Sequence, residues 1–393
     1  MKKLFVLLLA VLCALTLAGC SGSKEEGGGE APADEAVYVK LGGSGPLSGD
    51  AKVYGEAVRN AAQIAVDEIN TSDSKIKFDF NMADDEADGE KAVAAYSTLY
   101  DWGMQVSLMT VTSGAGAAVA SSYDEDQIFA ITPSGSSTAL VYTDSKNFKS
   151  NFQMCFTDPN QGVASADYMK EHFADKTIAV IYKSDDVYSA GVNEKFAVQA
   201  AANGLNVVYS GAFTDDSSTD FSTQLTAAKD AGADLVYLPI YYQPASIILK
   251  QASDMGYAPV FFGVDGMDGI LTLEGFDTSL AEGVYLLTPF AADADDEQTK
   301  HFVEAYKKAY GDTPNQFAAD AYDCVYAIHQ ALENLGYNSG YSTNGLCDDM
   351  IAQFTSMSFD GVTGKNMTWA ENGEVSKAPK AVVISGGVYV SAD

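Results

Sequence analysis

Hydrophobic residues along this chain follow two alternating spacings, which predict strands and helices in turn. Short apolar runs, typical of buried strands, are followed by stretches in which apolar residues recur every three or four positions, typical of helices. Residues 53–70 illustrate the helical spacing, because Val58, Ala62, Ala65 and Ile69 would share one face of a helix there.

This alternation occurs in two successive runs, followed by a tail. The first run predicts strands at 37–42, 76–82, 106–111 and 128–132, and helices at 53–70, 89–102 and 115–123. The second predicts helices at 162–173, 187–203, 219–231 and 244–255, and strands at 177–182, 207–212, 234–239 and 260–264. The tail is predicted to be mostly helical over 295–357 and strand-like at 365–369 and 381–390. This order favours an α/β fold with two doubly wound parallel-sheet lobes.

Length and charge narrow the range of functions. A chain of 393 residues is too long for one ordinary core and suits two domains. Its 54 acidic residues outnumber its 23 basic residues, so the net charge is −31. Such a surface repels phosphate groups, and we therefore exclude nucleic acids as partners.

The first residues predict export and lipid attachment. Two lysines precede an apolar run at residues 4–17, which is short for a bilayer span and typical of a signal peptide. The sequence LAGC at 17–20 is similar to the cleavage site of a bacterial lipoprotein. We expect residues 1–19 to be removed, Cys20 to carry lipid, and residues 20–36 to tether the body to the outer face of the cell membrane. The alternative is an ordinary secretory signal in which Cys20 has no role.

The residue sets that catalysis requires are missing from the sequence. Its three histidines fall in predicted helices without a second histidine at ligand spacing, and it contains neither GxSxG nor GxxxxGK[ST]. Gly43 and Gly45 follow a strand, but Pro46 and Ser48 break the dinucleotide-binding fingerprint. We therefore expect no enzyme activity, no cofactor and no metal.

Two further patterns have a structural and a functional interpretation. Residues 84–89 are similar to the start of a calcium loop, but Ala95 stands where the last acid belongs, which favours a helix cap. Cys324 and Cys347 lie on neighbouring predicted helices, where they would either pair or remain buried thiols.

Polar residues that follow the predicted strands suggest a ligand site, because open parallel sheets bind ligands at the carboxyl ends of their strands. In the first run these residues are Ser113, Ser134 and Ser136, and in the second they include tyrosines and Asp265. Hydroxyl and N–H groups at a helix N-terminus suit a carboxylate, whereas a carboxylate in a partly dry cleft requires a cation. A small zwitterion such as an α-amino acid fits both groups, although Ser113 alone would equally serve as a helix cap.

Six stretches, in order along most of the chain, carry a resemblance to a known family. They are GSGPLSGDAKVYGEAVRNAAQIAVDEIN (43–70), YDEDQIFAITPSGSS (123–137), VIYKSDDVYSAG (180–191), TDFSTQLTAAKDAGADLVYLPIYYQPASIILKQASDMG (219–256), FFGVDGMD (261–268) and AEGVYLLTPF (281–290). Together they resemble the substrate-binding proteins of ABC importers, of the branched-chain amino acid type within the periplasmic binding protein type 1 fold.

The resemblance implies two lobes joined by three crossovers of the chain, near 156–160, 288–290 and 362–365. The expected lobes are 37–156 with 289–362, and 157–288 with 363–393. A small amino acid, with the branched-chain type favoured, would bind between the lobes, and the monomeric protein would deliver it to the permease of an ABC importer. The same fold would alternatively bind an amide, a urea-like compound or an aromatic acid, or serve as a sensory module.

The resemblance also implies a role for each polar residue of the site. Ser113 matches the position that holds the ligand carboxylate, and Ser134 and Ser136 match a turn that holds the carboxylate and the ammonium. Asp265 takes the place of an acidic partner of the ammonium, which is often glutamate in leucine binders.

The matching aromatic positions are tyrosines. Tyr188 matches a residue that lines the second lobe, and Tyr54 matches one at the mouth of the first. Either Tyr242 or its neighbour Tyr241 matches a further ligand-lining tyrosine, because one extra residue leaves the register open. Packing between the lobes is the alternative role for each tyrosine.

Overall fold

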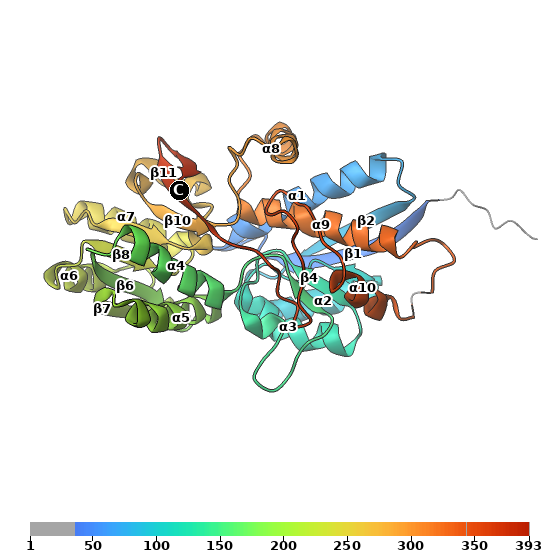
Figure 1. Cartoon of the computed structure of the whole chain (residues 1–393), viewed down its shortest axis with the longest axis horizontal. Coiled ribbons are helices and arrows are strands. Elements are labelled where there is room, and N and C mark those ends of the chain that lie inside the picture. Colours follow the sequence, from blue (N-terminus) through green and yellow to red (C-terminus); the bar gives the residue numbers. More distant parts are fainter. Residues whose placement is uncertain (1–35, 343, 393) are drawn as a thin grey trace, which may run out of the picture. The chain divides into compact units, whose positions relative to one another are not determined.

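The computed structural model describes residues 36–342 and 344–392 (Figure 1). The predicted signal segment 1–19, Cys20 and the tether up to residue 35 lie outside this part of the chain, so lipid attachment stays a prediction. Within the described ranges, no helix combines the length and the apolar character needed to cross a bilayer.

A sheet of five parallel strands forms the centre of the first lobe. Its spatial order is β2 (Ile76–Asp84), β1 (Val37–Gly45), β3 (Val106–Ser107), β4 (Phe129–Thr132) and β5 (Asn151–Gln153). The first helices of this lobe are α1 (Lys52–Thr71), α2 (Gly89–Trp102) and α3 (Ser113–Glu125). Alternate residues of β4 face opposite sides of the sheet, as in any strand. Phe129 and Ile131 belong to the core beneath α1, and Ala130 belongs to the core beneath α2 and α3.

A sheet of seven strands forms the centre of the second lobe. Its spatial order is β12 (Val388–Ser391), β11 (Lys380–Ser385), β10 (Tyr285–Thr288), β9 (Val260–Gly263), β8 (Leu235–Leu238), β6 (Thr177–Lys183) and β7 (Asn206–Phe213). Pairing is parallel from β7 to β10 and antiparallel for β11 and β12. The covering helices are α4 (Asp158–His172), α5 (Val187–Asn203), α6 (Ser222–Asp230) and α7 (Tyr242–Asp254).

The tail of the chain returns to the first lobe before it completes the second. The tail helices are α8 (Glu297–Tyr310), α9 (Gln316–Asn334) and α10 (Leu346–Phe354). Helix α9 packs along α1, and α10 packs against β4 (Figure 1). The chain therefore passes between the sheets three times: after β5, after β10 and before β11. Cys324 in α9 and Cys347 in α10 are buried free thiols in the structure.

Helix ends follow local sequence signals, which explains why several predicted helices match closely. Helix α2 begins after Asp88, whose carboxylate accepts the Lys91 N–H at 2.9 Å. It ends at Gly103, whose φ of 90° is a left-handed conformation that glycine adopts without strain. The acidic stretch 84–89 thus provides a helix cap, as predicted, and Asp296 begins α8 by accepting the Thr299 N–H at 3.0 Å.

Short strands account for most differences from the predictions. The predicted strand at 106–111 ends at Ser107, because Met109 has a φ of 51°, which breaks the extended backbone. Residues 381–390 are two strands rather than one, since Gly386 and Gly387, with φ of 62° and 79°, form a hairpin turn. Residues 365–369 make only isolated bridges to nearby chain instead of a strand. Strands β5 and β10 are absent from the predicted elements.

Contacts of the tail with the first lobe indicate where the chain returns to the second lobe. Trp369 Nε1 donates to the Gln153 carbonyl at 2.9 Å, and the Gln153 N–H donates to the Gly373 carbonyl at 2.9 Å. Further along, Lys377 Nζ lies 2.6 Å from Asp320 Oδ1 in α9. These contacts tie the segment to the first lobe, and we propose that the last crossover follows Lys377, later than the resemblance implies.

Candidate ligand-binding site

The polar strand ends of both sheets meet around one small cavity between the lobes. Every residue predicted to contact the ligand lines this cavity except Tyr242. The lining residues are Tyr54, Val111, Thr112, Ser113, Ser134, Ser136, Tyr188, Tyr241, Asp265, Gly266 and Phe317. The cavity is narrow, with a volume of only about 10 Å³.

The first-lobe wall presents hydroxyl groups at the N-terminus of α3 and in the turn after β4. Ser113 opens α3, and its Oγ accepts a backbone N–H of that turn at 3.1 Å. Ser134 donates its hydroxyl to the Val111 carbonyl at 2.8 Å, and the Ser136 carbonyl accepts the Asp158 N–H at 2.9 Å. These bonds fix the turn against the helix end, where the partial positive charge of the helix favours an anion.

The second-lobe wall carries the carboxyl group of Asp265, which follows β9. The Tyr188 hydroxyl donates to its Oδ1 at 2.6 Å, and Gln161 Nε2 donates to its Oδ2 at 2.8 Å. Burial raises the pKa of Asp265 to about 7, although the hydrogen bond from Tyr188 acts to lower it. A cation beside Asp265 would stabilise the ionised form, so this wall favours a positively charged group.

Two tyrosines of the second lobe stack at the cavity. The rings of Tyr188 and Tyr241 lie parallel with centroids 5.0 Å apart, and Tyr241 meets Tyr54 edge-on at 5.5 Å. The Tyr241 hydroxyl faces the backbone N–H of Ser113, which acts to lower its pKa, but burial dominates and raises the pKa of Tyr241 well above its usual value. Tyr241 therefore reaches across to the helix end of the first lobe.

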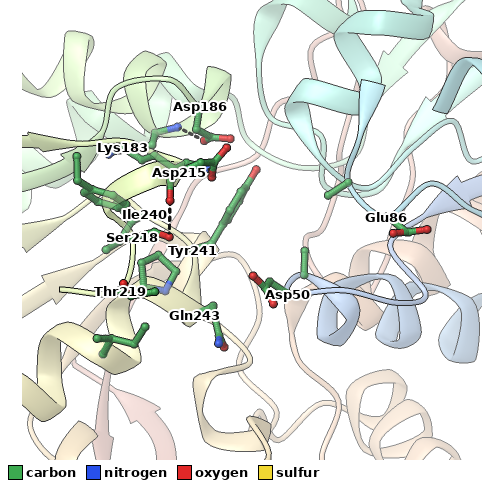
Figure 2. Close-up of a pocket in the computed structure, with 16 residues that line it drawn as sticks. Asp50, Glu86, Lys183, Asp186, Asp215, Ser218, Thr219, Ile240, Tyr241 and Gln243 are labelled. Atoms are coloured by element: carbon green, nitrogen blue, oxygen red, sulfur yellow. Dashed lines mark hydrogen bonds and ion pairs between the residues drawn. The ribbon is translucent and has the colours of Figure 1, made fainter. Parts of the chain in front are cut away.

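Tyr241 also lines a larger outer pocket and so lies between that pocket and the inner cavity. Figure 2 shows Asp50 and Glu86 of the first lobe on one side of the outer pocket, and Lys183, Asp215 and Tyr241 of the second lobe on the other. Lys183 pairs with Asp215 at 2.5 Å. The outer pocket has a volume of about 340 Å³ and is therefore much larger than the inner cavity.

Tyr54 and Tyr242 join the two lobes directly. Tyr54 in α1 donates its hydroxyl to the Gly266 carbonyl and accepts the Tyr242 N–H at 3.1 Å. Tyr242 donates its own hydroxyl to the Asp50 carbonyl at 2.6 Å. Of the two tyrosines whose register the sequence leaves open, Tyr241 lines the cavity, whereas Tyr242 bridges the lobes beside it.

Several residues of the site have no assigned role in the sequence analysis. Among them, Thr112 and Phe317 line the cavity, and Asp158 and Gln161, in the first turn of α4, bond to predicted site residues. Burial raises the pKa of Asp158 well above its usual value. Thr112 carries a usable signal, because it is a hydroxyl residue at a predicted strand end next to Ser113. Phe317 carries none, since it comes from the distant tail.

The charge of the cavity wall limits what it can hold. Its lining residues include the Asp265 carboxyl group and no lysine or arginine. The buried ammonium of Lys377 is engaged elsewhere, by Asp320 at 2.6 Å. No group of three histidine, cysteine, aspartate or glutamate side chains in the described ranges could hold a metal ion. The site therefore favours a ligand that brings its own cation together with an acceptor for the α3 N-terminus.

The chain is similar to known proteins over most of its length. A family model described as periplasmic binding protein matches residues 38–387. A leucine-, isoleucine-, valine-, threonine- and alanine-binding protein of Pseudomonas aeruginosa is 26% identical over 304 residues, which cover 77% of this chain and 79% of that protein. A Leu/Ile/Val-binding protein of Rhizobium johnstonii is 25% identical over 300 residues, which cover 76% of this chain and 80% of that protein.

Solved structures share the two-lobed fold. A leucine binding protein from Thermotoga maritima gives a TM-score of 0.79 at 23% identity, covering 90% of this chain and 98% of that one. A solute binding protein from R. palustris in complex with benzoate gives a TM-score of 0.80 at 19% identity, covering 91% and 96%. At these identities the likeness establishes the fold.

Proposed function

Because this chain belongs to the periplasmic binding protein family, we propose that it captures a small amino acid between its two lobes and delivers it to the permease of an ABC importer. Branched-chain amino acids are favoured, since the relatives in Pseudomonas aeruginosa and Rhizobium johnstonii are described as binding them. The protein acts by binding and release, without chemical conversion of its ligand.

The observation that carries this proposal is the pairing of opposite polarities across the cavity. The N-terminus of α3 with Ser113, and the turn of Ser134 and Ser136, lie on one wall, and the buried Asp265 lies on the other. An α-amino acid would place its carboxylate on the helix end and its ammonium on Asp265. Each charged group of the ligand would then meet its complement, which offsets the free energy of removing both from water.

Binding requires the inner cavity to enlarge, because its volume of about 10 Å³ is too small for an amino acid. Motion at the three crossovers, with displacement of the Tyr241 ring towards the outer pocket, would provide the space. A ligand that bridges the walls would then stabilise the closed arrangement of the lobes.

Asp265 discriminates between this proposal and its alternatives. A purely anionic aromatic acid, such as the benzoate bound by the R. palustris protein, would set a second negative charge beside a buried carboxyl group, which is unfavourable. Amides and urea-like compounds lack the negative group that the α3 N-terminus favours. A sensory role would use the same site with a different downstream partner.

Ligand binding by the wild-type protein is tested by a thermal-shift screen of the common amino acids, benzoate, acetamide and urea, followed by calorimetry of the best ligand. We expect an aliphatic amino acid to give the largest rise in melting temperature, because a ligand that binds only the folded state stabilises it by mass action. Asp265→Ala should weaken binding by about 2–5 kcal/mol. Asp254→Ala, at an exposed carboxylate of the same lobe, is the matched control and should bind like wild type.

We further propose that lipid on Cys20 holds the monomeric protein outside the cell membrane. This rests on residues 1–20 of the sequence. In a bacterial host, Cys20→Ser should move the protein from the membrane fraction to the soluble fraction, and light scattering of the released protein should give the mass of one chain. Retention of Cys20→Ser in the membrane fraction would refute the lipid anchor.

A further inference from the structure

The hydroxyl group of Thr112 is buried without a hydrogen-bond partner. Thr112 is the N-cap residue of α3, where a threonine usually accepts an N–H from the first turn of its helix. Its side chain makes no such bond, and its Oγ1 has no other partner. Its carbonyl, by contrast, accepts the Gly116 N–H at 2.9 Å. The hydroxyl proton of Thr112 is therefore free to donate to a ligand.

This hydroxyl belongs to the wall of the inner cavity. Thr112 lines the cavity beside Ser113 and is only 4% exposed. Of the neighbouring hydroxyl groups, Ser134 donates its proton to the Val111 carbonyl, and Ser113 Oγ accepts the Ser137 N–H. Thr112 thus offers the first-lobe wall a hydroxyl proton that no protein group uses.

An unpaired buried hydroxyl destabilises the folded protein, so it calls for a functional explanation. The N-terminus of α3 favours an anion at the position that Thr112 adjoins. A ligand carboxylate there would accept the hydroxyl proton in a charge-assisted hydrogen bond, which is stronger than a bond between neutral groups.

We propose that Thr112 is a ligand-contacting residue whose hydroxyl donates to the carboxylate of the bound amino acid and selects ligands that carry this group. The inference rests on the proposed function and deepens it. It assigns to Thr112 a carboxylate bond that the hydroxyl proton of Ser134 is not free to make.

Two substitutions of Thr112 distinguish the effect of its hydroxyl group from the effect of its side-chain shape. Thr112→Val removes the hydroxyl with little change in volume, and Thr112→Ser keeps the hydroxyl. The probes are L-leucine and L-leucinamide, which share an ammonium and a side chain but differ in the carboxylate. Affinity is measured by calorimetry, and the melting temperature is measured without added ligand.

We expect Thr112→Val to bind L-leucine about 10- to 100-fold more weakly than wild type, as follows from losing a hydrogen bond to a charged group. Its preference for L-leucine over L-leucinamide should shrink, whereas Thr112→Ser should retain both affinity and preference. The melting temperature of Thr112→Val should equal or exceed that of wild type, because the unpaired hydroxyl has been removed.

Three results would overturn the inference. If wild type binds L-leucine and Thr112→Val binds it equally well, the inference fails alone and the proposed function stands. If Thr112→Val melts several degrees lower and Thr112→Ser does not, the hydroxyl caps α3 instead of holding a ligand. If wild type binds none of the amino acids in the screen, the proposed function and this inference fail together.

Discussion

The Tyr188 hydroxyl lies 2.6 Å from Oδ1 of Asp265, and both residues are buried on the second-lobe wall of the cavity. The Gly266 N–H donates to the same hydroxyl at 2.9 Å, which fixes its position. This contact orients the carboxyl group and also holds the Tyr188 ring parallel to Tyr241. The acidic and aromatic parts of the site are therefore one connected unit.

Ligand affinity is expected to rise with pH through the range of Asp265 ionisation. The pKa of Asp265 is about 7 in the ligand-free protein, and a bound ammonium would lower it. Affinity is therefore close to its maximum at about pH 8, is about half of that at pH 7, and falls by about tenfold between pH 8 and pH 6. Calorimetry with L-leucine across this range measures the effect. Asp265→Asn should bind weakly with a flat pH profile, and a flat profile in wild type would contradict the prediction.

Tyr54→Phe should favour separation of the lobes. The substitution removes the hydrogen bonds that Tyr54 makes to the Gly266 carbonyl and the Tyr242 N–H, both in the second lobe. We expect a larger radius of gyration by small-angle scattering without ligand, and binding weakened by about 5- to 100-fold, since two bonds of about 0.5–1.5 kcal/mol each are lost. Tyr96→Phe removes a hydroxyl that bonds within the first lobe and is the control. Identical scattering from Tyr54→Phe and wild type would argue against the bridging role.

Tyr241→Ala should widen the range of ligand sizes. The ring lies between the inner cavity and the outer pocket, so its removal would join the two spaces. We expect L-phenylalanine to gain at least tenfold in affinity relative to L-valine, measured by calorimetry. Ile247→Ala enlarges only the outer pocket and should leave this ratio unchanged. An unaltered size ranking in Tyr241→Ala would show that another residue limits the ligand.

Lys377→Met should destabilise the protein through Asp320. Lys377 Nζ lies 2.6 Å from Asp320 Oδ1 and 2.6 Å from Thr363 Oγ1, and its side chain is 1% exposed. Removing one partner of a buried ion pair lowers the free energy of unfolding by about 3–5 kcal/mol, because the other charge is left unpaired. Urea denaturation measures this loss.

A double variant and a control variant test whether the buried ion pair is the cause of this loss of stability. Adding Asp320→Asn to Lys377→Met should recover most of the loss, since no uncompensated charge remains. Lys250→Met, which breaks the exposed pair with Asp254, should change stability by less than about 0.5 kcal/mol. Equal losses in Lys377→Met and in the double variant would exclude the ion pair as the cause.

Periodicity and caps made much of the fold predictable. Helix α2 begins and ends where the sequence places it, because Asp88 and Gly103 are local signals that act within one helical turn. The same holds for α5, which starts after the capping Asp186. Strand ends with serines or an acid likewise indicate the ligand site, because parallel strands place their carboxyl ends at one edge of a sheet.

The sequence by itself determined two α/β lobes, the polar residues at their strand ends and the opposite polarity of the two groups, since these depend on spacing and residue type. Only the tertiary structure decided that Tyr241 enters the cavity while Tyr242 bridges the lobes, that Gln161 holds Asp265, and that the Thr112 hydroxyl lacks a partner. Those outcomes depend on which side chains meet across the lobes and the helix termini. Contacts between residues far apart in the chain leave no local pattern, because they arise only when the whole fold brings the residues together.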